Sequence, residues 1–220
     1  MYRRAAKCVA THRSLYTVVM KHVRRQIAFV LELLTIFIAP VAIIYFGLIP
    51  FESRLWVLGL YLAVIVYLAT RNHVTLRKLG MRTDNLRRCF MPYAIFTALT
   101  VAGVIVVATF LGKGTSGWNE NTHLLFLFLP LSFAQEFIYR GYLMYELRQF
   151  LTSALAVVIV NAVLFAWLHV VFPVSPFIIL LSFAAGIGYA AMYYKFPNLF
   201  LAAFSHGVLN FFVVILYAFI

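Results

Sequence analysis

About seven long apolar stretches, most of them near twenty residues, dominate this sequence of 220 residues. A helix needs about 20 apolar residues to cross the hydrocarbon core of a bilayer. Hydrophobic residues make up 65% of the chain and charged residues 11%, whereas soluble domains have roughly 45–50% and about 25%. Because a water-soluble fold of this size could not bury so much apolar surface, we expect an all-α, polytopic transmembrane helical bundle of about seven spans.

The polar segments between these stretches set the expected domain organisation. We expect a basic cytoplasmic N-terminal segment at 1–26, followed by a single membrane domain at 27–220. The spans of that domain are expected at 27–49, 55–70, 89–111, 123–147, 153–171, 177–194 and 199–219.

Basic residues are concentrated in two segments of a chain whose formal net charge is +12. Seven of the 18 Lys and Arg residues lie in 1–26, and six lie in 71–88. Short segments rich in Lys and Arg stay on the cytoplasmic side, and two apolar stretches separate these two, so both can face the cytoplasm. We expect the lipid bilayer as a partner and no nucleic acid, because the composition excludes a soluble DNA-binding domain.

Glu136 and Arg140 are ionisable residues inside the fourth expected span. Each ionised side chain at mid-membrane costs about 2.5–3.5 kcal/mol even on a lenient insertion scale. Their i, i+4 spacing places both on one helical face, where an ion pair can form. Such a pair can serve helix packing alone, but ionisable residues within a membrane are functional candidates by default. We therefore take the pair as the centre of a candidate site.

Two later spans carry polar or aromatic side chains at the same spacing. In one span, Asn161, Phe165 and His169 follow one another at intervals of four residues, and in the last span His206 and Asn210 do so. A lone histidine in an apolar span is more often a hydrogen-bonded core residue. Recurrence of the spacing in three spans, where polar residues are disfavoured, favours one shared site.

Helix lengths support convergence for two of the three spans. Glu136 and His169 lie roughly 21 and 28 Å along their helices from a turn near residue 150, so they can meet in an antiparallel hairpin. His206 lies only about 14 Å from the turn at Pro197 by the same measure. The depth of His206 relative to the other two residues is therefore left open.

These motifs resemble the CPBP intramembrane protease family, which includes the CAAX prenyl endopeptidases and immunity-type relatives. The family pattern is Glu-Glu-x-x-x-Arg, then Phe-x-x-x-His, then His-x-x-x-Asn, and the resemblance covers roughly 76–212. It implies an intramembrane endopeptidase of a bacterial or archaeal plasma membrane, acting on a membrane-associated peptide or protein without a cofactor or a metal. The matching residues here are Gln135, Glu136, Arg140, Phe165, His169, His206 and Asn210.

Gln135 departs from the family pattern, which has a glutamate at this position. The resemblance implies that this glutamate, with the histidine of the second motif, activates the attacking water. Glutamine cannot accept a proton at neutral pH. Either Glu136 serves as the base in this chain, or its chemistry is impaired.

The favoured interpretation is hydrolysis of a peptide bond by water held between Glu136 and His169. His206 and Asn210 are expected to donate hydrogen bonds to the oxyanion. Supporting positions are assigned to Gln135, Arg140, Phe165 and Asn161.

Two alternatives remain open at the level of the sequence. His169, His206 and Glu136 form an acceptable ligand set for a zinc protease, although the His-Glu-x-x-His motif is absent. A non-enzymatic membrane protein, such as an immunity or chaperone-like factor, is the other alternative, and Gln135 is its main support.

Overall fold

The structure is a computed structural model that describes residues 20, 23–112, 123–172 and 176–216. Throughout these residues the regular elements are helices. The chain forms two compact units, Met1–Pro40 and Val41–Ile220. Most of the basic segment 1–26 lies outside the described residues.

Five helices in the described part of the chain are long and apolar enough to cross a membrane. The expected all-α polytopic bundle is therefore confirmed, with five such helices in place of about seven. Of the other two expected spans, α10 (Leu199–Ile215) is a shorter apolar helix. The fourth is not among the five long apolar helices. The five long helices are Val23–Tyr45, Phe51–Arg71, Leu86–Phe110, Ala154–Val171 and Pro176–Lys195.

The fourth expected span consists of three consecutive helical segments. They are α6 (His123–Glu136), the π-helix η3 (Phe137–Leu143) and α7 (Met144–Phe150). A π-helical turn has a wider hydrogen-bonding pattern than an α-helix, and such turns occur frequently at functional sites. The change of helix type begins directly after the ionisable residue Glu136.

The first unit is helical in its described part and includes the π-helix η1 (Leu33–Ile38). The helix continues as α2 (Ala39–Tyr45). The larger unit then contains η2 (Phe51–Ser53), α3 (Arg54–Arg71), α4 (Leu86–Phe110), α8 (Ala154–Trp167), η4 (Leu168–Val171) and α9 (Pro176–Lys195), besides the segments named above.

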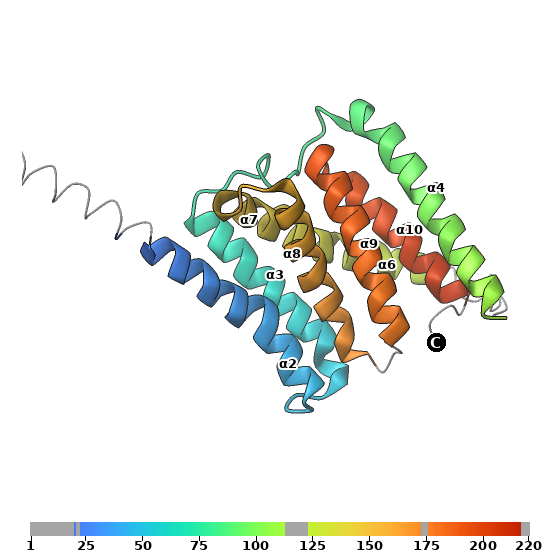
Figure 1. Cartoon of the computed structure of the whole chain (residues 1–220), viewed down its shortest axis with the longest axis horizontal. Helices are drawn as coiled ribbons and strands as arrows, with labels where there is room; N and C mark the ends of the chain where they lie inside the picture. The colour runs from blue at the N-terminus through green and yellow to red at the C-terminus, as the bar shows by residue number, and fades with distance from the viewer. Residues whose placement is uncertain (1–19, 21–22, 113–122, 173–175, 217–220) are drawn as a thin grey trace, which may run out of the picture. The chain divides into compact units, whose positions relative to one another are not determined.

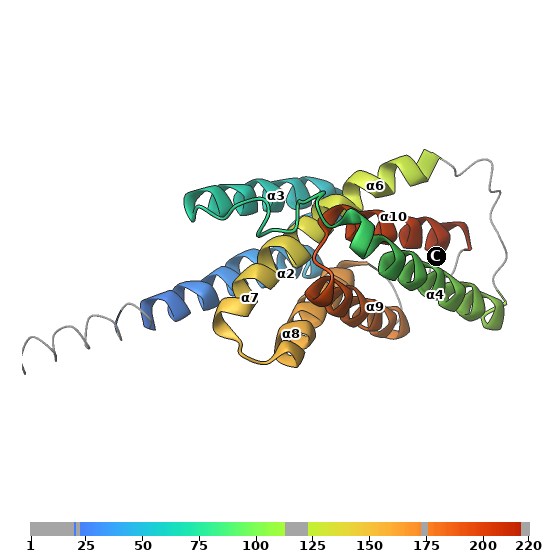
Figure 2. The ribbon, with the colours of Figure 1, turned by 90° about the horizontal axis from the view of Figure 1, so that it is seen from above.

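Within the larger unit, α10 packs against both α6 and α4, and α8 packs against α9 (Figures 1 and 2). Glycines permit these close approaches. A Cβ added to Gly186 of α9 would lie 3.2 Å from the Cα atom of Ala162 on α8, and one added to Gly207 of α10 would lie 2.9 Å from Leu129 of α6. Small residues of this kind let membrane helices approach each other closely.

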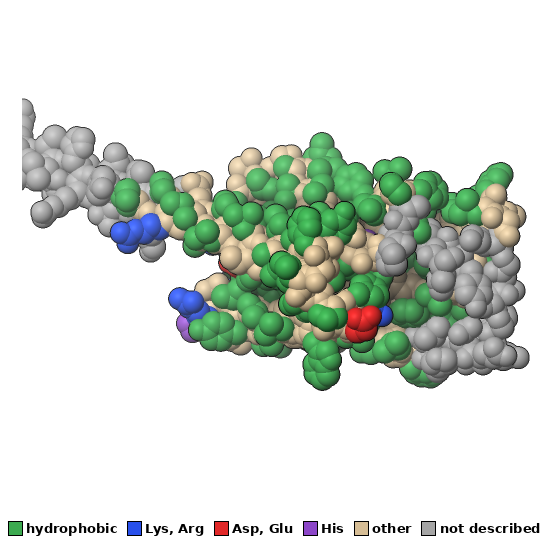
Figure 3. Space-filling view, turned by 90° about the horizontal axis from the view of Figure 1, so that it is seen from below, with side chains coloured by type: hydrophobic (Ala, Val, Ile, Leu, Met, Phe, Trp, Pro, Cys, Tyr) green, Lys and Arg blue, Asp and Glu red, His purple; other side chains and the backbone are tan. Residues whose placement is uncertain are grey.

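Large hydrophobic side chains cover the outside of the helices. The exposed fractions of Trp56, Phe110 and Phe126 are 83%, 87% and 75%, and the face drawn in Figure 3 is largely hydrophobic. Contiguous exposed apolar surface of this extent is unusual for a soluble monomer. The protein is an integral membrane protein, in which lipid chains cover these side chains.

Two of the helices begin at side-chain caps. Ser153 accepts a hydrogen bond from the backbone N–H of Ala156 at the start of α8, and Asn198 accepts one from Leu201 at the start of α10. Ser and Asn are preferred at this position because their oxygens satisfy backbone donors of the first helical turn. The second cap matters for the candidate site, because α10 carries His206 and Asn210.

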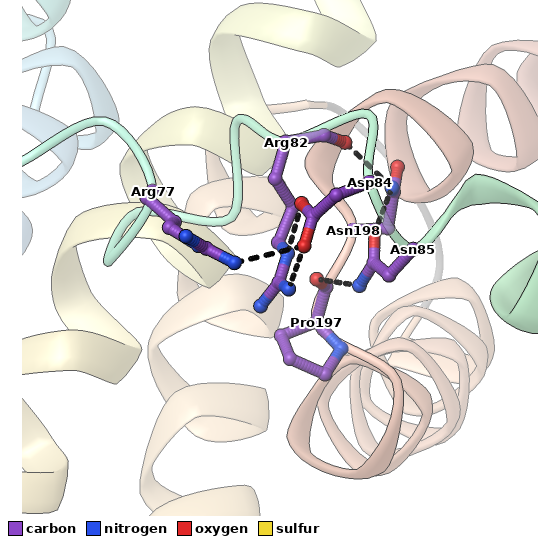
Figure 4. Close-up of polar contacts among 6 residues, drawn as sticks. All are labelled: Arg77, Arg82, Asp84, Asn85, Pro197 and Asn198. Atoms are coloured by element: carbon purple, nitrogen blue, oxygen red, sulfur yellow. Dashed lines mark hydrogen bonds and ion pairs between the residues drawn. The ribbon is translucent and has the colours of Figure 1, made fainter.

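The connection between α3 and α4 carries a small network of ion pairs (Figure 4). Arg82 donates from Nε to Oδ1 of Asp84 over 2.9 Å, and Arg77 donates from Nη2 to Oδ2 over 2.9 Å. The hydrogen bond from Arg82 holds the pKa of Asp84 below its usual value, and the positive charge of Arg77 acts in the same direction. The network therefore favours the ionised form of Asp84 in the folded protein.

This lowered pKa predicts a loss of stability in acid. Asp84 stabilises the folded state above its unfolded pKa of about 4, and the contribution is lost as the pH falls through the lower folded pKa. We expect the thermal unfolding midpoint of the wild type in detergent to fall more steeply than that of Asp84→Asn below about pH 4. Parallel midpoint curves for the two proteins would contradict this assignment.

Candidate active site

Glu136 lies at the junction of α6 and η3, with none of its side chain exposed. All seven residues of η3 are buried as well. A buried carboxylate requires a compensating charge or hydrogen bonds. The neighbouring helices provide both.

Arg140 and His206 share one oxygen of the Glu136 carboxylate. Nη1 of Arg140 lies 3.2 Å from Oε1, and Nδ1 of His206 lies 2.9 Å from the same atom. The ion pair allowed by the i, i+4 spacing is therefore present. Because a carboxylate only accepts, His206 donates through Nδ1, and Nε2 is unprotonated in the neutral imidazole.

The second carboxylate oxygen of Glu136 has no such partner. Oε2 is buried and makes no hydrogen bond to any residue that the structure describes, and the same holds for Nε of Arg140 and Oδ1 of Asn161. Unsatisfied buried polar atoms are rare in native proteins and call for an explanation. A carboxylate with one oxygen fixed and the other available can accept a hydrogen bond or a proton at the available oxygen.

Two aromatic rings enclose the charged group. The guanidinium carbon of Arg140 lies 4.2 Å from the ring centre of Phe165 and 5.6 Å from that of Tyr189. The ring centre of His206 lies 5.6 Å from that of Phe165 and 5.2 Å from that of Tyr189. Cation–π contacts of this kind stabilise a buried cation without adding a second negative charge.

His169 lies on η4, the 3-10 turn that follows α8, and is half-buried. Its Nδ1 lies 3.0 Å from the backbone oxygen of Phe165, so Nδ1 donates and Nε2 is left as an acceptor. The His169 and Phe165 rings are also in contact, with centres 5.0 Å apart. The partners of Glu136 among the described residues are Arg140 and His206 rather than His169.

The direct contact between Glu136 and His206 resolves the question of depth. The turn before α10 is buried, since Asn198 and Leu199 are 0% exposed. The estimate from helix length places the turn at the end of the bundle. In the structure the connection between α3 and α4 covers this turn through hydrogen bonds to Asn198 and Leu199, and His206 on α10 contacts Glu136 directly.

Three other residues were expected at the site: Asn210, Asn161 and Gln135. The first two make hydrogen bonds to residues of α6 and η3. Asn210 donates from Nδ2 to Oγ of Ser132 over 3.1 Å, one turn before Glu136 on α6. Asn161 donates from Nδ2 to the backbone oxygen of Tyr139 over 2.6 Å and so ties α8 to η3. Gln135 lies on α6 and is half-buried.

A hydroxyl chain behind His206 contains residues that sequence reasoning missed. The hydroxyl of Tyr189 lies 3.2 Å from Oγ of Ser205, and Ser205 lies 2.6 Å from Oγ1 of Thr97, whose hydroxyl also bonds to the backbone oxygen of Tyr93. The chain joins α9, α10 and α4 next to His206. Hydroxyl residues are common in apolar helices, so only the adjacency of Ser205 to His206 could have signalled this role.

The side chains offer little support for a metal centre. Among the described residues, no group of three or more His, Cys, Asp or Glu side chains is close enough to hold a metal ion. The proposed zinc ligands His169, His206 and Glu136 are thus not gathered as a ligand set.

Comparison with known protein families gives one match. Residues 116–212 match the family model described as type II CAAX prenyl endopeptidase Rce1-like. This segment is Rce1-like. The match confirms the resemblance to the CPBP and CAAX proteases, and the matched segment contains every residue of the expected site. No curated protein and no solved structure matches the chain.

The Rce1-like segment begins before α6 and ends within α10. It supplies the carboxylate from α6, the guanidinium from η3, and the two imidazoles from η4 and α10. The family is a protease family of the CAAX type, so the match over this segment supports a protease in general. The connection between α3 and α4 lies outside the matched segment.

Proposed function

We propose that this protein is an intramembrane endopeptidase in which Glu136 is the base that activates the attacking water. One observation carries the proposal: a fully buried carboxylate has one oxygen held by Arg140 and His206, while the other oxygen has no hydrogen-bond partner among the described residues. The held oxygen fixes the orientation of the group. The other oxygen is then available to take a proton, as a general base must.

The proposed reaction begins when Oε2 of Glu136 accepts a proton from water as the water oxygen attacks the peptide carbonyl. The carbonyl oxygen becomes an oxyanion in a tetrahedral intermediate. The carbon–nitrogen bond then breaks, and the proton held by Glu136 passes to the leaving nitrogen, which yields a carboxylic acid and an amine. His169, with Nε2 as an acceptor, is proposed to orient the same water.

Asn210 and His206 are proposed to stabilise the oxyanion by donating hydrogen bonds to it. The two side chains differ in whether they have a donor available. Asn210 uses one amide hydrogen on Ser132 and keeps a second N–H for the oxyanion. His206 already donates through Nδ1 to Glu136, so it can donate through Nε2 only as the imidazolium. Removing an oxyanion donor typically lowers kcat by about 10²–10³-fold.

The substrate class follows from the location of the site and the family. Because the site lies in a membrane bundle, the proposed substrate is a membrane-associated peptide or protein.

The proposed orientation in the membrane follows from the basic residues. Arg71 lies before the connection between α3 and α4, and Arg87 and Arg88 lie after it. Since segments rich in Lys and Arg stay on the cytoplasmic side, we place this connection and the basic N-terminal segment on that side.

Gln135 favours one other candidate function. A chain without the first acid of the motif could bind peptides without cleaving them and act as an immunity or chaperone-like factor. In that case Glu136 and Arg140 would serve as a buried structural pair. The two functions differ in whether any product forms.

The experiment that tests the proposal uses the full chain reconstituted in vesicles. A library of membrane-tethered peptides is incubated with the wild type and with Glu136→Ala, and products are identified by mass spectrometry. We expect cleavage by the wild type alone, retained after exhaustive chelation. Cleavage that disappears on chelation would favour the zinc alternative, and no cleavage of any peptide would favour the non-enzymatic one.

A further inference from the structure

The connection between α3 and α4 is fastened to the turn between α9 and α10. Asn198 donates from Nδ2 to the backbone oxygen of Arg82 over 2.9 Å and to Oδ1 of Asn85 over 2.7 Å. Asn85 donates in return to the backbone oxygen of Pro197 over 3.0 Å. Figure 4 shows these contacts, in which two asparagines hold two segments that are more than a hundred residues apart in the chain.

A second part of the same connection, Leu79–Gly80, contacts the helices of the site. The backbone N–H of Leu199, the first residue of α10, donates to the oxygen of Gly80 over 2.9 Å. The hydroxyl of Tyr193 on α9 donates to the oxygen of Leu79 over 2.8 Å. A Cβ on Gly141 would lie 3.3 Å from that same oxygen of Leu79, so the connection also lies against η3.

Gly80 is required for this close approach. Its φ is +75°, a conformation that residues with a side chain rarely adopt. A Cβ at this position would also lie 1.9 Å from the hydroxyl oxygen of Tyr193. Backbone conformation and available space both select glycine here.

We infer that the latch, defined as Leu79, Gly80, Asn85, Tyr193 and Asn198, is a positioning element that sets the contact between Glu136 and His206. One side of the latch lies against Gly141, the residue that follows Arg140, and the other side bonds to the start of α10. His206 lies seven residues beyond Leu199, about 10 Å along the helix. A shift of α10 by about 1 Å at its start would therefore move His206 relative to Glu136.

This inference rests on the proposed function, because its consequence is a catalytic rate. Misplacement of a catalytic group by about 1 Å can cost about a hundredfold in rate. Leu79, Gly80 and Asn85 of the latch lie outside the Rce1-like segment, whereas Tyr193 and Asn198 lie inside it. The positions of the site residues thus depend on a part of the chain that carries no site residue.

The test separates the latch from the helix cap that Asn198 also provides. Asn198→Ser keeps an oxygen that can cap α10 but removes both amide donations to the connection. Tyr193→Phe removes only the hydroxyl that bonds to Leu79. Ser153→Ala is the matched control, because it removes a helix cap at the start of α8 and does not touch the latch.

We expect Asn198→Ser and Tyr193→Phe each to lower kcat by about ten- to a hundredfold with KM nearly unchanged. The double variant is expected to be little worse than either single one, because both changes act through one network. Ser153→Ala is expected to leave kcat unchanged. Unchanged kcat in Asn198→Ser, with a lowered unfolding midpoint alone, would mean that Asn198 is only structural and would overturn the inference.

Hydrogen exchange in the same variants gives a readout that does not require proteolysis. We expect faster amide exchange both at 199–206 and at 137–143 in Asn198→Ser and Tyr193→Phe, and in neither segment of Ser153→Ala. Faster exchange confined to the first turn of α10 would overturn the inference. A wild type without protease activity would refute the proposed function, whereas the exchange result would still decide whether the latch couples α10 to η3.

Discussion

Replacing Glu136 with glutamine is expected to lower kcat/KM for peptide hydrolysis by about 10²–10⁴-fold, the usual contribution of a general base. Glutamine has nearly the same shape, and its oxygen can still accept the hydrogen bond from Nδ1 of His206. It cannot take a proton from water. The measurement is the cleavage rate of a membrane-tethered peptide that the wild type cleaves.

The matched control for this variant is Glu52→Gln. Glu52 is an exposed carboxylate on η2, so the same chemical change there is expected to leave kcat/KM unaltered. Gln135→Glu provides a second comparison and is not expected to rescue Glu136→Gln, because the base is assigned to position 136. Wild-type rates in Glu136→Gln would reject the assignment of Glu136 as the base.

Replacing Arg140 with methionine is expected to destabilise the fold by about 3–5 kcal/mol, the usual cost of removing one partner from a buried ion pair. Both side chains of the pair are 0% exposed, so water cannot replace the lost guanidinium. The variant leaves the carboxylate of Glu136 in an apolar bundle with His206 as its remaining partner. The measurement is the change in unfolding free energy of the purified protein in detergent.

The double variant Glu136→Gln/Arg140→Met is expected to recover most of that loss, because it removes the uncompensated charge together with its partner. Arg77→Met is the matched control. Arg77 pairs with Asp84, but 71% of its side chain is exposed, and exposed pairs contribute little to stability. If Arg140→Met were no more destabilising than Arg77→Met, the buried pair would not hold the site together.

The spans could be predicted because the bilayer imposes a length on any apolar helix. Helix α4, at Leu86–Phe110, begins three residues earlier than the expected span 89–111 and ends one residue earlier than the end of that span. Helix α9, at Pro176–Lys195, extends one residue beyond the expected span 177–194 at each end. The fourth span was only partly predictable, since hydropathy does not distinguish an α-helix from the π-helix η3.

The candidate site could be predicted in its composition but not in its pairings. The i, i+4 spacing of Glu136 and Arg140 is a property of one helix, so the sequence alone indicated the ion pair. The contact of Glu136 with His206 joins two helices whose residues are 70 positions apart in the chain, so it depends on how α10 packs against α6. The hydroxyl chain through Tyr189 and Ser205 was also unpredictable, because it joins side chains from α9, α10 and α4, and the packing of these helices brings them together.

The sequence by itself determined that this protein is a helical membrane protein and which ionisable side chains lie within its spans. Both follow from local properties: the apolar length that a bilayer requires and the cost of placing a charge inside it. Only the tertiary structure decided that His206 rather than His169 contacts Glu136, and that Leu79–Gly80 lies between η3 and α10. These contacts depend on helix register, which arises from packing and hydrogen bonds between segments distant in the chain.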